Sequence, residues 1–258
     1  KCPECGSNDM RYGGFGTQKI EDELSEFLPE ARVLRMDADT TMSRFSHEEK
    51  LGAFARSEYD IMLGTQMVAK GLDFENVTLV GVISADSQLF SDDFRSQERT
   101  FDLITQVVGR SGRGKYSGTA VIQTINPENE VIRLAAEQDY DKFYGEEIQI
   151  RKLLIYPPFC DICLIGFVGE DETKVKAAAD VFFDMTKPIL SSKSVIALGP
   201  MPARVVKISN KYRYRLILKC KNNKQFRSDL GSVLSSFGKL SRFGGVSVYV
   251  DINPQTLI

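Results

Sequence analysis

The chain has 258 residues, of which 42% are hydrophobic and 26% are charged, and this is the composition of an ordinary globular protein. No apolar run approaches the roughly 18 residues that a membrane-spanning helix needs, so we expect no membrane-embedded part. The net charge of −2 conceals an asymmetry, because residues 1–149 have an excess of 11 acidic residues and residues 150–258 an excess of nine basic ones. A basic half is typical of a domain that meets a polyanion, although a lysine-rich surface alone would give the same balance.

The pattern of elements changes near residue 156. Before it, apolar strands alternate with amphipathic helices, which predicts a parallel sheet covered on both sides. The expected strands are 32–37, 60–64, 77–84 and 119–124, and the expected helices are 17–28, 45–56, 95–109 and 128–150. The strand at 77–84 is almost wholly apolar, as is typical of a strand buried on both faces.

After residue 156 the sequence predicts a compact α+β unit. Its expected elements are a strand at 160–168, a helix at 171–192, one or two strands within 203–220, a helix at 223–238 and a strand at 246–252. The helix at 171–192 has an apolar stripe made of Val175, Ala178, Ala179, Phe182 and Phe183. We therefore expect an α/β lobe at 11–155 and a smaller α+β C-terminal domain at 156–258.

The five cysteines, an odd number without a secretory signal, favour a reducing cytoplasm over a disulfide framework. Cys2 and Cys5 have the spacing of a zinc knuckle, in which Pro and Gly turn the backbone so that two thiolates face one ion. Zinc needs four ligands and one pair is present, so we expect residues 1–10 to be the end of a zinc-binding region. Cys160 and Cys163 also have CxxC spacing, but they begin an apolar strand, where thiols usually pack as small hydrophobic groups.

The strongest chemical signal is the run from Gln106 to Gly114, which places Arg110 and Arg113 on a glycine-rich turn at the end of a helix. Two planar guanidinium groups in this arrangement suit the oxygens of a transferring phosphoryl group. Such an arginine is worth about 10³–10⁵ in turnover. The alternative is a pair of surface arginines on a turn.

A second signal lies about 40 residues earlier, where an apolar strand leads into Thr65 and Gln66 and then into a short helix that ends at Gly71. A hydroxyl and free amide groups at a helix start bind phosphate well. Asp73 follows one turn later, where it could accept hydrogen bonds from a ribose or from the arginine pair.

These two stretches resemble motifs V and VI of the superfamily 2 helicases. The closer resemblance is to the family of primosomal protein N-prime (PriA), the bacterial replication-restart DNA helicases. It extends essentially from end to end of the chain. The residues that carry it, besides the two stretches, are 77–82, Ala85-Asp86, Arg99-Thr100-Phe101, 156–159 and 212–219. The family usually has a histidine where Leu72 stands, a departure that leaves Gly71 and Asp73 intact.

The resemblance implies a RecA-like lobe that shares ATP and Mg²⁺ with another lobe. It implies that Gln106, Arg110 and Arg113 face the γ-phosphate, with one of the two arginines as the arginine finger. The nucleotide cleft would be lined by Gly71, Asp73 and Gly109, and Thr65 and Gln66 would contact the DNA backbone. Cys2 and Cys5 resemble the last of the family's four CxxC pairs, which together bind two Zn²⁺ ions.

The resemblance also implies that the C-terminal domain helps to bind forked DNA and single-strand-binding protein, besides other primosome proteins. Basic residues interleaved with Tyr212 and Tyr214 suit phosphate pairing and base stacking, and we select Lys211, Arg213 and Arg215 as DNA contacts. The alternative is an amphipathic strand whose tyrosines lie in the core.

Two elements of an ATP site are not found in the 258 residues. No Gly-Lys-Ser/Thr loop is present to hold the β-phosphate, and no Asp-Glu pair for Mg²⁺ follows a strand before the two motifs. We therefore expect the sequence to be a C-terminal part of a 3′-to-5′ helicase that does not hydrolyse ATP by itself. The alternative function is a non-catalytic DNA- or protein-binding module with a vestigial motor fold.

Overall fold

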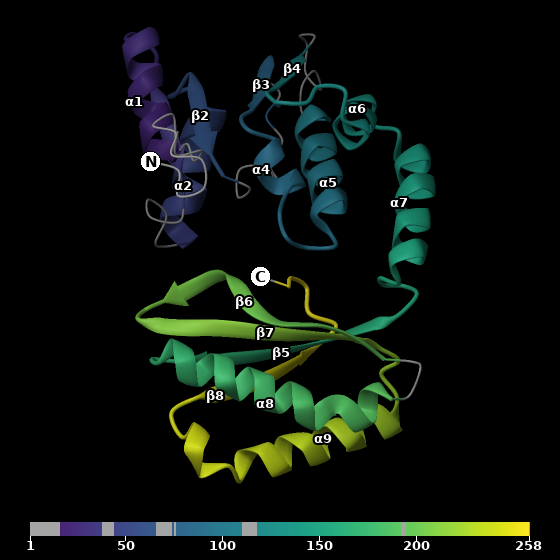
Figure 1. The fold of residues 1–258 in the computed structure, drawn as a ribbon. Helices are drawn as coiled ribbons and strands as arrows, with labels where there is room; N and C mark the ends of the chain where they lie inside the picture. Colours follow the sequence, from purple (N-terminus) through teal and green to yellow (C-terminus); the bar gives the residue numbers. More distant parts are fainter. Residues whose placement is uncertain are drawn as a thin grey trace, which may run out of the picture. The chain divides into compact units, whose positions relative to one another are not determined.

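The computed structural model describes residues 16–37, 44–65, 74, 76–109, 118–191 and 195–257. The chain forms two compact units, Lys1–Ser84 with Asp102–Thr124, and Ala85–Phe101 with Ile125–Ile258. Figure 1 shows the fold with the labels used below. In the part that the structure describes, no helix is long and apolar enough to cross a membrane.

The first unit contains two parallel strand pairs. Its elements are helix α1 (Thr17–Phe27), strand β1 (Val33–Met36), helix α2 (Arg44–Ala55), and strands β2 (Ile61–Gly64), β3 (Leu79–Val82) and β4 (Thr119–Ile122). Strand β1 pairs with β2, and β3 pairs with β4. Arg32 and Asp60, just before β1 and β2, are joined by a two-pronged ion pair with N–O distances of 2.9 Å. The strands and helices expected for the described residues of this unit are confirmed, within a few residues at their ends, while the short helix expected to end at Gly71 lies outside the described residues.

The prediction that the strand at 77–84 is buried on both faces is wrong for this structure. The side chains of Leu79 and Val121 are 64% and 56% exposed. In the register of the pair, Leu79 lies beside Thr119 and Gly81 beside Val121, so these four residues share one face. That face has no covering layer within the described part of its unit, whereas the opposite face is half-buried.

Four further helices precede β5 in the described residues: α4 (Asp86–Leu89) and α5 (Ser96–Val108) between β3 and β4, and α6 (Glu130–Glu137) and α7 (Tyr140–Leu154) after β4. The single helix expected at 128–150 is therefore two helices. Helix α6 ends at Gln138, whose backbone is left-handed (φ 59°), and the Asp139 side chain then accepts a hydrogen bond from the Lys142 N–H and caps α7. A local cap overrides the continuous helical pattern here.

The C-terminal domain is a four-stranded antiparallel sheet with two helices, as Figure 1 shows. Its elements are β5 (Asp161–Gly169), α8 (Glu172–Leu190), β6 (Ile196–Ile208), β7 (Lys211–Cys220), α9 (Lys224–Gly238), the 3₁₀ turn η1 (Ser241–Phe243) and β8 (Ser247–Ile252). The strand order is β6-β7-β5-β8, so the βαββαβ chain order produces a ferredoxin-like sheet. The expected α+β unit is confirmed, and β6 begins earlier than the sequence suggested.

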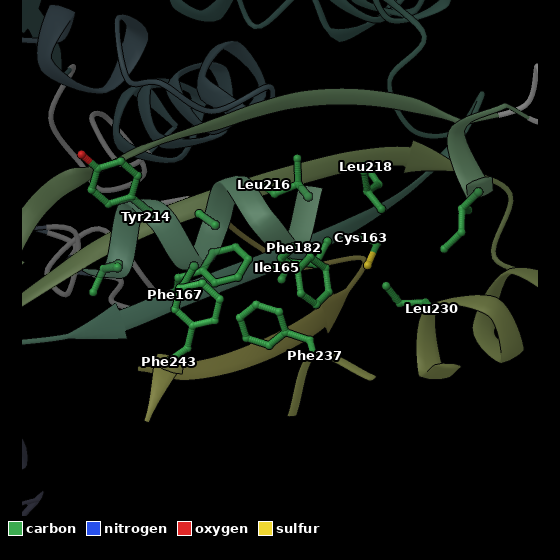
Figure 2. Close-up of a cluster of buried hydrophobic side chains, with 14 of the residues drawn as sticks. Cys163, Ile165, Phe167, Phe182, Tyr214, Leu216, Leu218, Leu230, Phe237 and Phe243 are labelled. Carbon is green, nitrogen blue, oxygen red and sulfur yellow. The ribbon is translucent and has the colours of Figure 1, made fainter. Parts of the chain in front are cut away.

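The core of this domain lies between the sheet and the helices α8 and α9 (Figure 2). Phe182 of α8 is fully buried, and its ring makes edge contacts with Phe167 at 5.4 Å and with Phe237 at 5.3 Å between centroids. The predicted stripe on α8 is confirmed, since Val175, Ala178, Ala179 and Phe182 are all 0% exposed, with Phe183 packed at the edge. Burial of such aromatic side chains contributes most of the stability of a core this size.

The other face of the sheet has a smaller apolar cluster that contains Ile162, Leu164, Ile217 and Leu257. Cys160 packs against this cluster, whereas Cys163 lies in the helix-side core, where burial raises its pKa to about 12. The two thiols therefore belong to opposite faces of the sheet and cannot hold one metal ion together. This supports their interpretation as small hydrophobic residues.

Candidate nucleotide and nucleic-acid sites

The two candidate sites are described to different extents. Seven of the predicted site residues lie outside the described residues: Cys2, Cys5, Gln66, Gly71, Asp73, Arg110 and Arg113. Their proposed roles therefore stay predictions, while Thr65, Gln106, Gly109, Lys211, Arg213 and Arg215 can be placed.

The described part of the candidate nucleotide site consists of the ends of two elements of the first unit. Thr65 directly follows β2 and is exposed, at the carboxyl end of a parallel strand, where ligands of α/β sheets usually bind. Gln106 is exposed in the last turn of α5, and Gly109 ends this helix, with its N–H donating to the carbonyl of Thr105 at 3.0 Å. The chain thus leaves α5 directly into Arg110.

The opposite face of α5 is buried and holds the helix in place. Thr100 and Ile104 are each 1% exposed, and the ring of Phe101 stacks on Phe143 at 4.2 Å between centroids. The Thr100 hydroxyl donates to the carbonyl of Ser96, so its polar group is satisfied within the helix. The position of Gln106 in solvent is therefore a consequence of the apolar stripe on the other side.

Asp86, one of the residues that carry the family resemblance, is buried and binds the backbone. It is 7% exposed, and its carboxylate accepts the N–H of Ile125 at 2.9 Å. This bond ties the start of α4 to the chain that follows β4. The structure also reveals Asp93 as a buried carboxylate that sequence reasoning did not select. No capping pattern marks it, because a capping residue directly precedes its helix and Asp93 lies three residues before the start of α5.

The alternation of strand β7 decides which of its polar side chains are available. Tyr214 is 8% exposed in the helix-side core, and its hydroxyl donates to Glu172 at 3.5 Å. It does not present its ring to a base, so for Tyr214 the alternative of a core tyrosine is correct. Tyr212 is half-buried, with the Lys207 ammonium 4.5 Å from the centre of its ring.

The prediction that Arg215 contacts DNA is replaced by a structural role. Arg215 is 4% exposed, and its guanidinium donates to the carbonyl of Leu257 and to the carboxylate of Asp92. It lies on the face of β7 that the C-terminal residues cover, so the guanidinium is not free to meet a phosphate. Lys219 is likewise buried, donates to the carbonyl of Leu154 at 2.7 Å, and has its pKa lowered by burial.

The basic residues of β7 that are not buried, Lys211 and Arg213, lie near the turn between β6 and β7. Ser209 and Asn210 both have positive φ, at 49° and 62°, which is the conformation of a tight two-residue hairpin turn. Lys211 next to this turn is exposed, and the half-buried side chain of Arg213 makes no hydrogen bond or ion pair to any described residue. Lys211 and Arg213 therefore remain candidate DNA contacts.

Comparison with known proteins identifies both parts of the chain. Residues 15–115 match the family model described as "Helicase conserved C-terminal domain", and residues 152–255 match "Primosomal protein N C-terminal domain". The "Replication restart protein PriA" of Bacillus subtilis is 41% identical over 257 residues, which cover 100% of this chain and 32% of that protein. The chain belongs to the PriA family.

Other PriA proteins show the same relation. Those of Synechocystis and Chlamydia trachomatis are 37% and 40% identical and cover 99% of this chain, which spans 30% and 34% of their lengths. The chain thus spans about a third of the length of the PriA relatives that it matches. The helicase model includes the stretches around Thr65 and Arg113, and the fold is the expected α/β helicase lobe followed by a smaller C-terminal domain.

Proposed function

We propose that this chain supplies the arginine-finger half of the ATP site, and part of the DNA-binding surface, of an ATP-dependent 3′-to-5′ DNA helicase. The helicase would act in replication restart and primosome assembly at stalled forks. The observation that carries the proposal is the PriA similarity along the whole chain, which includes both predicted motifs. The exposure of Gln106 on a helix that leads directly into Arg110 supports it.

The residues of the arginine motif fit a triphosphate by the chemistry of their donors. Arg110 and Arg113 offer planar guanidinium groups, and Gln106 offers an amide, to oxygens on which negative charge accumulates during phosphoryl transfer. Gly71, Asp73 and Gly109 would line the cleft for ATP with Mg²⁺. In this proposal, closure of the lobes brings the guanidinium groups onto the γ-phosphate, and Thr65 and Gln66 shift along the DNA backbone as the lobes close and open.

The amino-terminal thiols fit half of a zinc site. Zinc in structural sites has four ligands, and Cys2 and Cys5 would supply two thiolates of one ion. The remaining ligands would come from elsewhere in the intact enzyme, so we expect the 258-residue chain alone to bind zinc weakly. Zinc content near one ion per purified chain, measured by mass spectrometry, would contradict this expectation.

The ATP-site proposal is tested by Arg113→Ala and Arg110→Ala in the full-length enzyme that contains this chain. We expect the finger variant to lose about 10³-fold or more in DNA-stimulated ATP turnover. DNA affinity should change little, because in this proposal the arginines would contact the nucleotide and not the DNA. Turnover at the wild-type rate in both variants would favour a non-catalytic binding module.

The DNA-binding proposal concerns Lys211 and Arg213. The double variant Lys211→Glu/Arg213→Glu should weaken binding to a labelled forked DNA in fluorescence anisotropy, and the weakening should shrink as salt is raised. Lys176→Glu is the matched control, since this exposed lysine lies on α8, on the other side of the sheet. Equal affinity of the double variant and the control would exclude the hairpin as a DNA contact.

Single-strand-binding protein and other primosome proteins are the partners proposed from family resemblance.

A further inference from the structure

The segment before α5 is joined to the last described residues of the chain by a buried carboxylate. The Asp93 side chain is 0% exposed and pairs with the Arg99 guanidinium at 3.2 Å. It also accepts the backbone N–H of Arg95 at 2.9 Å and that of Leu257 at 3.0 Å. One carboxylate therefore binds the backbone just before α5, pairs with a side chain of its first turn and holds residue 257, which is 164 positions away in the sequence.

Two arginines complete this junction from opposite sides. Arg215 of β7 donates to the carbonyl of Leu257, and Arg99 of α5 donates to the carbonyl of Gln255. Leu257 is thus held at its N–H by Asp93 and at its carbonyl by Arg215. Charge-assisted hydrogen bonds are the strong ones, and the two bonds to Leu257 are buried, whereas the bond from Arg99 to Gln255 is exposed.

Apolar packing supports the same junction. The Leu257 side chain is 5% exposed and lies in the cluster with Ile162, Leu164 and Ile217 on the sheet face away from α8 and α9. In Figure 1 the yellow C-terminal segment runs along this side of the sheet. Phe94, just before α5, packs against the same cluster.

A second ion-pair system holds the first turn of α5 to α7. The Arg151 guanidinium donates to Glu98 at 2.6 Å and to Glu147 at 2.7 Å, and only 14% of its side chain is exposed. It also lies over the ring of Phe94, with its central carbon 5.5 Å from the ring centre. The start of α5 is therefore fixed on several sides by residues of the C-terminal part of the chain.

Helix α5 links this junction to the arginine motif. The boundary between the two compact units falls inside α5, between Phe101 and Asp102. The helix continues without a break to Val108, a length of about 20 Å at 1.5 Å per residue. Gln106 lies in its last turn, and Arg110 follows Gly109 in the sequence, so the start of α5 and the arginine motif are joined by one continuous helix.

We propose that Asp93, Arg99, Arg215 and residues 253–257, together called the α5 clamp, are positioning residues for the arginine motif. This inference rests on the proposed function. In this proposal the clamp residues touch neither nucleotide nor DNA. They hold the first turn of α5 to the C-terminal residues, and the continuous helix passes this restraint on toward the arginine motif. A misplacement of about 1 Å in a catalytic group can cost about 10²-fold in rate, so release of the clamp lowers turnover.

The test compares three variants in the full-length enzyme, with Arg113→Ala measured in the same assay. Arg99→Met removes the guanidinium but keeps the stem and the helix propensity, and Arg99→Lys restores a cation toward Asp93 and Gln255. Arg133→Met is the matched control, an exposed arginine of α6 that is no part of the clamp. The readouts are kcat and KM of DNA-stimulated ATP hydrolysis, DNA affinity, and hydrogen–deuterium exchange at residues 105–109.

The clamp predicts a fall in kcat of about ten- to a hundredfold in Arg99→Met, with KM and DNA affinity within about twofold of wild type. Exchange at residues 105–109 should become faster, and Arg99→Lys should recover part of kcat. A wild-type kcat and unchanged exchange in Arg99→Met, with Arg113→Ala inactive, would overturn the clamp and leave the proposed function standing. Full turnover in Arg113→Ala would overturn both. If Arg99→Met fails to fold, Leu257→Ala is measured instead. A lower kcat with faster exchange at residues 105–109 would support the clamp, and a wild-type kcat with unchanged exchange would overturn it.

Discussion

The strand β7 offers a sharp test of its two arginines, because Arg213 and Arg215 lie two residues apart on the same face. Arg213 is half-buried without a described partner, whereas Arg215 is 4% exposed and bound to Leu257 and Asp92. We predict that Arg215→Met destabilises the folded chain without removing a DNA contact. We predict the reverse for Arg213→Met.

The magnitude for Arg215→Met follows from its partners. A hydrogen bond from a charged group contributes about 1.5–3 kcal/mol, and this applies to the bond to the buried carbonyl of Leu257. The Asp92 side chain is 70% exposed, so that ion pair adds only about 0–1 kcal/mol. Methionine keeps the packing of the stem, so we expect a net loss of about 2 kcal/mol, or about 4–8 °C in Tm.

Urea titration of the 258-residue chain, followed by far-UV circular dichroism, measures the free energy of unfolding of each variant. Fluorescence anisotropy with a labelled forked DNA, at one fixed salt concentration, measures the affinity. Arg213→Met should keep its stability within about 0.5 kcal/mol. The reasoning is refuted if Arg215→Met unfolds at the wild-type urea concentration and binds the fork tenfold more weakly.

Three further predictions follow from single positions. Gly199→Ala should lower the free energy of unfolding in urea by more than about 1 kcal/mol, since Gly199 has φ +99° and a Cβ there would lie 3.0 Å from the Arg215 carbonyl oxygen. An unchanged free energy of unfolding would contradict the backbone strain expected for alanine at this position. Iodoacetamide at about pH 8 should not label Cys163 or Cys220 in the folded chain, because burial raises the pKa of each thiol to about 12 and only thiolates react. Mass spectrometry measures the labelled fraction of each cysteine before and after unfolding, and labelling in the folded chain would contradict this prediction. Hydrogen bonds from the backbone N–H of residue 222 and the side-chain amide of residue 253 lower the pKa of Asp161. The ionised carboxylate therefore stabilises the fold above its unfolded pKa of about 3.9, and this contribution is lost as pH falls through the lowered folded pKa. Asp161→Ala should reduce Tm more at pH 7 than at pH 3, and an equal reduction at the two pH values would contradict this prediction.

Local sequence patterns were enough to predict most elements of the fold. The helical spacing from Val175 to Phe182 indicates one buried stripe, and the structure places these residues in the core. The period of an amphipathic helix depends only on neighbouring residues, so it can be seen without the tertiary structure. The break between α6 and α7 could not be predicted from the sequence, because Gln138 has a left-handed backbone and glutamine is not a residue type that favours this conformation.

The errors at the candidate sites have a different cause. Arg215 alternates with tyrosines in a way that is typical of a nucleic-acid surface, but Leu257 packs on that face of the sheet and accepts a hydrogen bond from the Arg215 guanidinium. Asp93 and Leu257 meet across 164 positions, and no local pattern predicts such a contact. Charge and aromatic content indicate which residues can bind a polyanion, while burial decides which of them can reach it.

In the proposed function these 258 residues supply the arginine half of an ATP site, and another part of the enzyme supplies the half that binds the β-phosphate. The most direct test of this claim is ATP turnover by the purified 258-residue chain in the presence of forked DNA, with the full-length enzyme as the positive control. We predict no turnover above the buffer blank from the chain and DNA-stimulated turnover from the enzyme. Hydrolysis by the chain alone, if Arg113→Ala abolished it, would contradict the claim.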